Sequence, residues 1–292
     1  MARDGSGPDP TCDTGHVRGS RSADDAGSVD PVDITDITDR FAELVRGPEQ
    51  RCRLDLGALL IAAHARRDLD VDAELDRLDE LAAGCPKPDL ESLTVHLFSD
   101  LGFHGDTDDY NDPRNSLLDV VLERRMGIPI TLSLVMLEVG RRAGVPLQGV
   151  GMPGHFLVRD ALDDDVFVDP FHGVQLDRAG CEALFARLHG DKARFDPRFL
   201  EPVGPRAVMA RMLTNLQRSF VGTGDRAGAL WAQCLRVLVP GATVSDRRQL
   251  AAMLAANGRF DAAALELDAI ADEGMGGDRD RIAASAMRAK LN

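Results

Sequence analysis

The fold of this chain is decided by residues 124–159, RRMGIPITLSLVMLEVGRRAGVPLQGVGMPGHFLVR, and by residues 166–171, VFVDPF. These stretches predict one helix followed by two or three strands, with His155 starting one strand and Asp169 ending the next. A His and an Asp on adjacent antiparallel strands can lie opposite one another and form a hydrogen bond. Such a pair is two thirds of a nucleophile–His–Asp hydrolase site.

The missing third of such a site is a nucleophile near the start of a helix, and the predicted helix begins near Pro129. Its first turns contain Thr131 and Ser133 but no cysteine. A hydroxyl is far less acidic than a thiol, so either residue would need His155 to take its proton during attack. In the alternative interpretation, which we favour, both hydroxyls cap the helix or form hydrogen bonds within its first turn.

Five short motifs follow one another in a fixed order: DPRNS at 112–116, LERR at 122–125, GIPITLS at 127–133, GVGMPGHFLV at 149–158 and DPF at 169–171. In this order they resemble the transglutaminase-like superfamily, and most closely its bacterial SirB-one (invasion-regulator-like) family. The match is dense from about residue 109 to 175, looser over residues 54–101 and absent from the first thirty or so. The resemblance implies a papain-like fold with the catalytic order Cys, His, Asp. The SirB-one family commonly lacks that cysteine, so the resemblance admits a pseudoenzyme and does not decide whether catalysis survives.

Three further residues near these motifs are candidates for ligand binding. Arg114 and Asn115 can donate to an oxyanion or a carboxylate, although a solvated Arg and a helix-capping Asn are the alternative. His172 stands where the family pattern has Asn, and with His155 and Asp169 it forms a set of three possible metal ligands. Because no further ligands lie nearby in the sequence, we expect no metal and no cofactor.

The composition narrows the classes of function. The chain has 292 residues, of which 44% are hydrophobic and 28% charged, as is ordinary for a soluble globular protein. Its formal net charge of −14 argues against nucleic acid or an anionic membrane as the principal partner. The sequence has no apolar run long enough to span a bilayer and no signal-peptide pattern at its start, so we expect a cytoplasmic protein.

The cysteines are scattered, at positions 12, 52, 85, 181 and 234, with no Cys-x-x-Cys pair and no Cys/His ligand spacing. Only Cys181 is close in sequence to the His–Asp pair. It follows Asp169 on a helix predicted over residues 177–188, whereas the superfamily's nucleophile precedes the His. We therefore interpret Cys181 as a small buried side chain.

Three regions are expected along the chain. Residues 1–33 are rich in Asp, Gly, Ser and Pro and are predicted to be disordered, because they contain too few large apolar side chains to offset the entropy of ordering. Residues 34–195 are predicted to form an α+β transglutaminase-like domain, with a helical N-terminal part and a small antiparallel sheet packed on a central helix. Its strands are predicted over residues 147–152, 155–159 and 166–169, and Asn115 or Ser116 is expected to cap a short helix before the central one.

Residues 206–291 contain an internal repeat with a period of 34 residues. The recurring pairs are Leu216 and Leu250, Phe220 and Leu254, Gly224 and Gly258, and Ala229 and Ala263. This period and pattern resemble tetratricopeptide repeats, which are pairs of antiparallel helices. Two units fall short of the three usually needed for independent stability, so we expect this module to pack on the core domain.

We therefore favour a non-catalytic peptide-binding, protein-binding or regulatory protein whose partner occupies a cleft lined by His155 and Asp169 or contacts the C-terminal repeats. The alternative is an amide or ester hydrolase or acyl transferase that uses Thr131 or Ser133 with the same His–Asp pair. The sequence contains no glycine-rich phosphate loop, nucleotide fingerprint or clustered metal motif that would favour another class.

Overall fold

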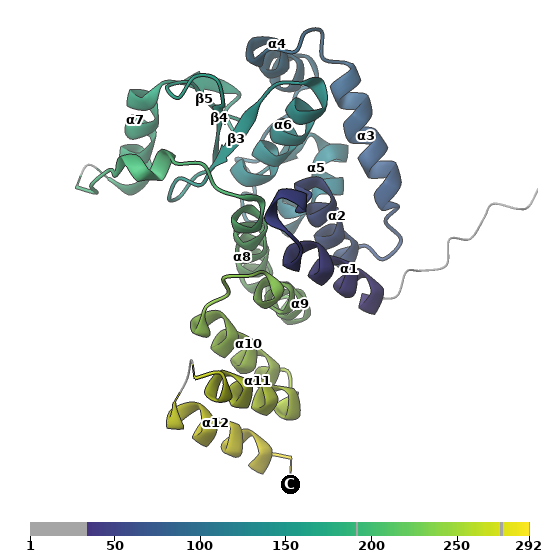
Figure 1. The fold of residues 1–292 in the computed structure, drawn as a ribbon, viewed down its shortest axis with the longest axis vertical. Coiled ribbons are helices and arrows are strands. Elements are labelled where there is room, and N and C mark those ends of the chain that lie inside the picture. The colour runs from purple at the N-terminus through teal and green to yellow at the C-terminus, as the bar shows by residue number, and fades with distance from the viewer. Residues whose placement is uncertain (1–33, 191, 275–276, 292) are drawn as a thin grey trace, which may run out of the picture. The chain divides into compact units, whose positions relative to one another are not determined.

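The computed structural model describes residues 34–190, 192–274 and 277–291 (Figure 1). The tail predicted to be disordered, residues 1–33, lies outside the described residues. In the described part helices predominate, and two small sheets accompany them, so the fold is mixed and rich in α-helix. None of the helices described there has the length and apolar character needed to cross a membrane.

The helices before the main sheet are α1 (Ile34–Arg46), α2 (Leu54–Ala65), α3 (Val71–Ala83), α4 (Leu90–Thr94), α5 (Leu118–Arg124) and α6 (Pro129–Ala143). A π-helical turn (Val95–Asp100) follows α4, and 3₁₀ turns occupy Glu49–Arg51, Pro113–Ser116 and Pro197–Leu200. The apolar faces predicted by periodicity are buried, as Phe41 of α1 and Leu59 of α2 show with no exposed surface. Asp70 is the cap of α3, since its carboxylate accepts the backbone N–H groups of Asp72 and Ala73.

The prediction that Asn115 or Ser116 caps the helix before α6 is wrong. Neither Asn115 nor Ser116 caps α5, which begins after Leu117 without any side-chain cap bond. The capping carboxylate in this segment is that of Asp112, which accepts the Arg114 N–H at the start of the preceding 3₁₀ turn. The side-chain amide of Asn115 is therefore available for contacts with more distant parts of the chain.

The main sheet has four antiparallel strands in the order β3 (Leu147–Val150), β4 (Leu157–Asp160), β5 (Phe167–Asp169) and β6 (Val174–Leu176). The strands are shorter than predicted, and His155 lies in the turn before β4 rather than on the strand. Sequence analysis missed β6, because three residues give no alternation to detect. It also missed a two-residue parallel pairing of β1 (His104–Gly105) with β2 (Met126–Gly127).

Helix α6 is the central helix, as expected, and Figure 1 shows it against the sheet. It contacts α3 and α5 as well as β3 and β4, and eleven of its fifteen residues are buried, so it is covered on nearly all sides. Its buried Glu138 needs cationic partners and has them, since Arg141 and Arg142 donate to that carboxylate at 2.9 and 2.8 Å. Gly144, in the left-handed conformation with φ 81°, ends the helix.

The C-terminal part is helical throughout: α7 (Arg178–His189), α8 (Pro205–Thr223), α9 (Arg226–Leu238), α10 (Val244–Ala256), α11 (Phe260–Asp272) and α12 (Asp278–Ala289). From α8 onward each helix packs on the next one. Of the positions 34 residues apart, Gly224 and Gly258 both follow a helix in the left-handed conformation. Helices α8 and α9 also contact α2, and their buried side chains from Val208 to Val239 belong to the same hydrophobic core as α1–α6.

A pair of leucine substitutions tests whether α8 belongs to the main core. Leu213 of α8 is fully buried in that core, whereas Leu265 of α11 is 67% exposed. Leu213→Ala should lower the free energy of unfolding by about 2–5 kcal/mol, because it removes buried methyl groups and leaves a cavity. Leu265→Ala is the control and should change it by less than about 0.5 kcal/mol. Urea unfolding followed by circular dichroism measures both values, and similar small losses for the two variants would contradict this view of α8.

Candidate functional site

The first turn of α6 is anchored by hydrogen bonds that use the hydroxyl of Thr131. Pro129 occupies the first helical position, where no backbone donor is needed. The Thr131 hydroxyl lies 2.7 Å from the carbonyl oxygen of Asn115, to which it donates, and it accepts the Ile128 N–H at 3.2 Å. Its side chain has no exposed surface. Thr131 therefore fastens the helix start to the preceding loop, as the capping interpretation predicts.

Ser133 is also fully buried. Its hydroxyl has one long contact as a donor, 3.5 Å from the carbonyl oxygen of Phe156. Among the hydrogen bonds of the described residues, none links Thr131 or Ser133 to the imidazole of His155. The two candidate nucleophiles are thus present at the helix start, and in this structure their hydroxyls bond to main-chain carbonyl groups rather than to the imidazole.

Asn115 and Arg114 lie beside the site rather than in it. The Asn115 amide donates to Asp106 at 3.0 Å and to the Asp109 carbonyl at 2.8 Å, while its oxygen accepts from Arg124 at 3.0 Å. With every polar atom of the side chain engaged and none exposed, Asn115 holds the loop together. The exposed Arg114 pairs with Asp112 at 2.7 Å. Neither residue lines the cavity described below.

The predicted hydrogen bond between His155 and Asp169 is present. Asp169 ends β5, and its Oδ1 lies 2.8 Å from Nε2 of His155, in the turn that precedes β4. Its other oxygen lies 2.7 Å from Nδ1 of His172, so one carboxylate holds two imidazoles. The Phe171 ring meets both imidazoles edge-on and packs against Gly105, where a Cβ atom would lie 2.4 Å from the ring.

Charge and burial determine the state of this carboxylate. Burial would raise the pKa of Asp169, but hydrogen bonds and charge from His155 and His172 outweigh it and hold that pKa below its ordinary value. An ionised carboxylate only accepts hydrogen bonds, so each imidazole donates to it. For His155 this leaves Nδ1 as the nitrogen for any other partner, and no hydrogen bond from the described residues reaches it.

His155, Asp169 and His172 also satisfy the spacing of a metal site, since one ligand atom from each lies within 4.8 Å of the others. The two carboxylate oxygens are directed at different imidazoles, however, and the short contacts are hydrogen bonds. Hydrogen bonding therefore accounts for the arrangement, and we propose no metal for it.

Cys181 does not replace the missing nucleophile. It is fully buried on α7, among the apolar side chains packed under the sheet. Burial, with a smaller contribution from neighbouring carboxylates, raises the pKa of its thiol to about 12. The thiolate needed for nucleophilic attack is therefore scarce near neutral pH.

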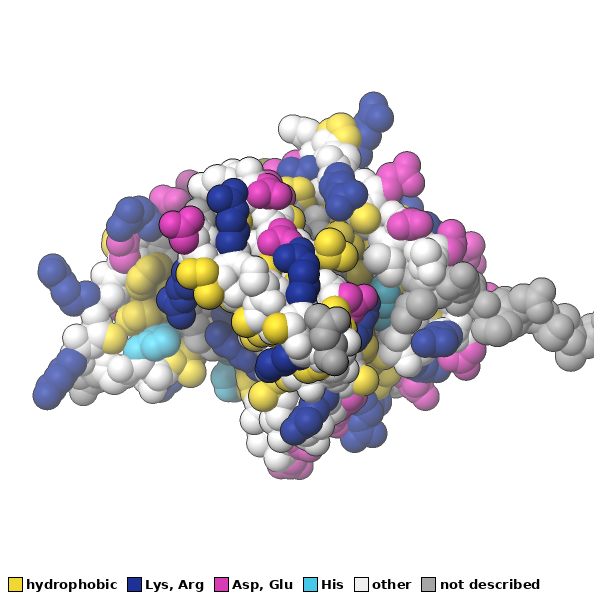
Figure 2. All heavy atoms as spheres, turned by 90° about the horizontal axis from the view of Figure 1, so that it is seen from below, with side chains coloured by type: hydrophobic (Ala, Val, Ile, Leu, Met, Phe, Trp, Pro, Cys, Tyr) yellow, Lys and Arg dark blue, Asp and Glu magenta, His cyan; other side chains and the backbone are white. Residues whose placement is uncertain are grey.

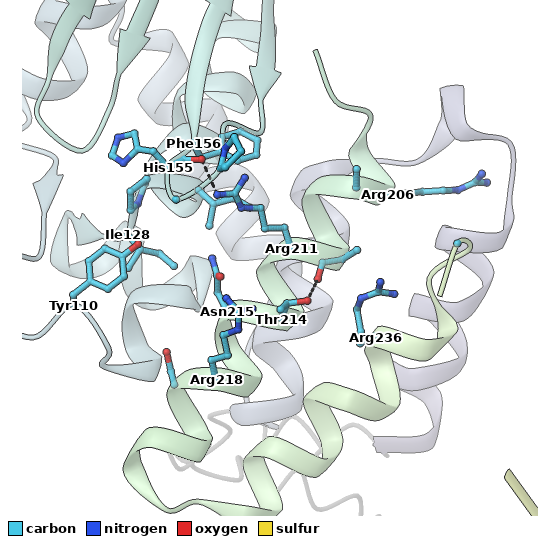
Figure 3. Close-up of a pocket in the computed structure, with 18 of the residues that line it drawn as sticks. Tyr110, Ile128, His155, Phe156, Arg206, Arg211, Thr214, Asn215, Arg218 and Arg236 are labelled. Carbon is cyan, nitrogen blue, oxygen red and sulfur yellow. Dashed lines mark hydrogen bonds between the residues drawn. The ribbon is translucent and has the colours of Figure 1, made fainter. Parts of the chain in front are cut away.

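A cavity of about 1020 Å³ opens beside His155 (Figure 3). One wall is the start of α6 with Ile128 and Ile130, together with Tyr110 from the preceding loop. The opposite wall is a face of α8, from which Arg211 and Arg218 project. Among the described residues of the lining there is no cysteine. The cavity is therefore suited to binding a ligand next to the imidazole.

Sequence analysis missed the residues that α8 and the loop contribute. Arg211 donates to the carbonyl oxygens of Met152 and His155, at 3.0 and 2.7 Å, and so fixes the turn that carries the imidazole. Burial lowers the pKa of Arg211 and raises that of Tyr110. Polar residues recur on one face of the helix within residues 206–223, and this pattern could have indicated a cavity wall. In the sequence, these residues belong to the region assigned to the repeats.

Two substitutions, Thr131→Val and Ser133→Ala, test the structural role of the hydroxyls at the start of α6. Thr131→Val should lower the free energy of unfolding by about 2 kcal/mol, because it leaves a buried carbonyl group and a buried N–H group without this partner. Ser133→Ala, which removes one long hydrogen bond, should lower it by less than about 1 kcal/mol. Chemical denaturation gives the order, and a smaller loss for Thr131→Val than for Ser133→Ala would refute the anchoring role.

The carboxylate of Asp169 makes a pH-dependent prediction. Because its pKa is lower in the folded state, its contribution to stability is present above its ordinary value of about 3.9 and is lost as the pH falls through the folded-state value. Asp169→Asn should therefore lower the free energy of unfolding by about 2 kcal/mol near neutral pH and by clearly less near pH 3. Denaturation curves at both pH values test this, and an equal loss at both would contradict it.

Comparisons with known proteins show the family to which the chain belongs. The family model of the transglutaminase-like superfamily matches residues 58–214. A UPF0162 protein of Xylella fastidiosa is 38% identical over 200 residues, which are 63% of this chain and 70% of that protein. A UPF0162 protein of Pseudomonas aeruginosa is 36% identical over 173 residues, 58% of this chain and 62% of that one. F-box only protein 21 of Homo sapiens is 36% identical over 149 residues, 48% of this chain but 22% of that protein. No solved structure matches. The chain belongs to the transglutaminase-like superfamily and, within the range of these matches, to the family of UPF0162 proteins.

Proposed function

We propose that this protein is a transglutaminase-like pseudoenzyme that binds a peptide or a segment of a partner protein in the cavity beside His155. The observation that carries the proposal is the combination of an open cavity with a start of α6 that presents no nucleophile. Pro129 and Ile130 face the cavity, whereas the hydroxyls of Thr131 and Ser133 are buried and bonded to main-chain carbonyl groups.

The His–Asp pair then serves recognition. Asp169 fixes the ring of His155, so Nδ1 is held ready for a hydrogen bond with a bound main chain or side chain. A preorganised group costs little entropy on binding. The helices from α8 to α12, as a tetratricopeptide-like module of the SirB-one type, would offer a second surface for partners. The 149 residues shared with an F-box protein are consistent with a role in protein interaction.

The second candidate is an amide or ester hydrolase that uses Thr131 or Ser133. The observation in its favour is the intact His155–Asp169 bond, which is the orienting half of a triad. Activity would require one hydroxyl to leave its carbonyl partner and turn toward His155. For Thr131 this means giving up the 2.7 Å bond that anchors α6, so we rank this candidate second.

Two measurements separate the candidates. A fluorophosphonate probe for serine and threonine nucleophiles should not label the wild-type protein. Labelling that disappears in Thr131→Val or Ser133→Ala would establish the hydrolase and refute the pseudoenzyme. In parallel, a random peptide library displayed on phage should yield sequences enriched on the wild-type protein.

The binding of the enriched peptides should depend on His155. His155→Ala should weaken it by about fivefold or more, since one hydrogen bond to a fixed partner is lost. His104→Ala is the matched control, because His104 is an exposed histidine outside the cavity lining. Failure to enrich any peptide, or equal effects of the two substitutions, would refute binding in this cavity.

A further inference from the structure

One face of α8 lines the cavity with polar side chains. The lining residues of this helix recur at intervals of three and four, which is the spacing of a single helical face: Arg206, Ala207, Ala210, Arg211, Thr214, Asn215, Arg218 and Ser219. In Figure 3 the side chains of Arg211, Asn215 and Arg218 extend from α8 into the space between this helix and the wall with Ile128 and Tyr110. We call these three residues of α8 the arginine face.

The two cations of the arginine face have no carboxylate partner within the described residues. Arg211 uses Nη2 for the carbonyl oxygens of Met152 and His155, and its guanidinium lies 5.6 Å from the centre of the Phe156 ring. Its remaining N–H groups have no acceptor in the described chain. Arg218 is exposed and forms neither an ion pair nor a hydrogen bond with any described residue.

The other cations of the lining are paired. Arg206 donates to the Val45 carbonyl and lies 3.9 Å from the carboxylate of Glu49, and Arg236 pairs with Asp246 at 3.1 Å. In Figure 3 both arginines lie apart from the arginine face. The unpaired positive charge of this cavity is therefore concentrated on one helix face.

This concentration contrasts with the charge of the whole chain. The formal net charge is −14, yet the described lining contains four arginines and one carboxylate. Elsewhere the charges are mixed, as Figure 2 shows for one face, where Lys and Arg side chains lie among Asp and Glu side chains. Arg211 and Arg218 also repel each other, and this repulsion adds to the effect of burial in lowering the pKa of Arg211. A bound anion would relieve this repulsion.

We infer that the arginine face binds acidic side chains of a peptide, next to His155. This inference rests on the proposed function and names the class of ligand. Arg211 and Arg218 are seven positions apart, which corresponds to about 10 Å along the helix. An extended peptide advances about 3.3 Å per residue and alternates its side chains between two faces, so carboxylates two or four positions apart share one face and, at about 7 or 13 Å, bracket the spacing of the two guanidinium groups.

The opposite wall of the cavity favours a peptide over a phosphate ligand. That wall presents Ile128, Ile130 and the Tyr110 ring, which suit apolar side chains between the acidic ones. Phosphate sites usually add successive backbone N–H groups from a glycine-rich loop, and the described lining has no run of glycines. The strongly negative chain also disfavours nucleic acid.

The test uses the displayed random peptide library on the wild-type protein and on Arg218→Gln. Arg218 is suitable because its side chain has no partner in the described residues, so its replacement should leave the fold intact. Arg279→Gln is the matched control, an exposed arginine on α12 outside the cavity lining. Peptides enriched on the wild type and on the control should be rich in Asp and Glu, and this bias should be lost on Arg218→Gln.

The strongest peptide then gives a quantitative test by calorimetry. Replacing each of its glutamates in turn by glutamine should weaken wild-type binding by about fivefold at the two that pair with Arg211 and Arg218, as expected for one exposed ion pair. For the glutamate that pairs with Arg218, the same replacement should have little effect on Arg218→Gln, since the two changes remove the same interaction. Independent, additive losses at every glutamate would overturn the inference.

The remaining outcomes separate the inference from the proposed function. Enriched peptides without acidic bias, or with a bias that survives in Arg218→Gln, overturn the acidic ligand while leaving peptide binding in place. Absence of any enriched peptide overturns the proposed function itself. Binding of a single-stranded DNA oligomer that requires Arg218, with no peptide bound, would also overturn the inference.

Discussion

The buried side chain of Asn115 holds together the parts of the chain that form the site. Its amide joins Asp106 and the Asp109 carbonyl on one side and Arg124 on the other, while its main-chain carbonyl receives the Thr131 hydroxyl. A buried polar network of this kind stabilises one arrangement strongly, because each broken bond leaves an unsatisfied group. The start of α6 is thereby fixed against the loop that carries Tyr110.

The use of the Thr131 hydroxyl as an anchor affects which reactions the site can support. A nucleophile must be able to move its proton to the base, which requires a side chain within hydrogen-bond reach of the imidazole. In this chain the hydroxyl nearest the start of α6 serves as an anchor, and the residues that face the cavity there are Pro129 and Ile130. The His155–Asp169 bond is formed, and no hydrogen bond among the described residues links His155 to a hydroxyl or a thiol. Stability of the helix start and catalysis would compete for the same hydroxyl.

Local patterns were enough to predict α6 and the His–Asp bond. The two Gly-x-Pro segments at 127–129 and 144–146 bracket the central helix, and strand order alone brings His155 near Asp169. The role of Asn115 was beyond such reasoning, because a cap and a tertiary amide look alike in sequence. The arginines of α8 were missed for a similar reason. They follow His155 by more than fifty residues, and only the packing of α8 against the core brings them to the cavity.

Helix α8 belongs both to the hydrophobic core and to the wall of the cavity. Met209, Leu213 and Leu216 bury one side of it in the hydrophobic core, while Arg211 and Arg218 form a wall of the cavity on another. The predicted boundary between residues 34–195 and 206–291 is therefore not a break in the core. The superfamily match also ends within α8, at residue 214. Because the same helix fills the core and bears the unpaired cations, its packing fixes the backbone positions from which both arginines project. Arg211 is also held by the carbonyl groups of Met152 and His155, so an anionic ligand would have to order only the side chain of Arg218.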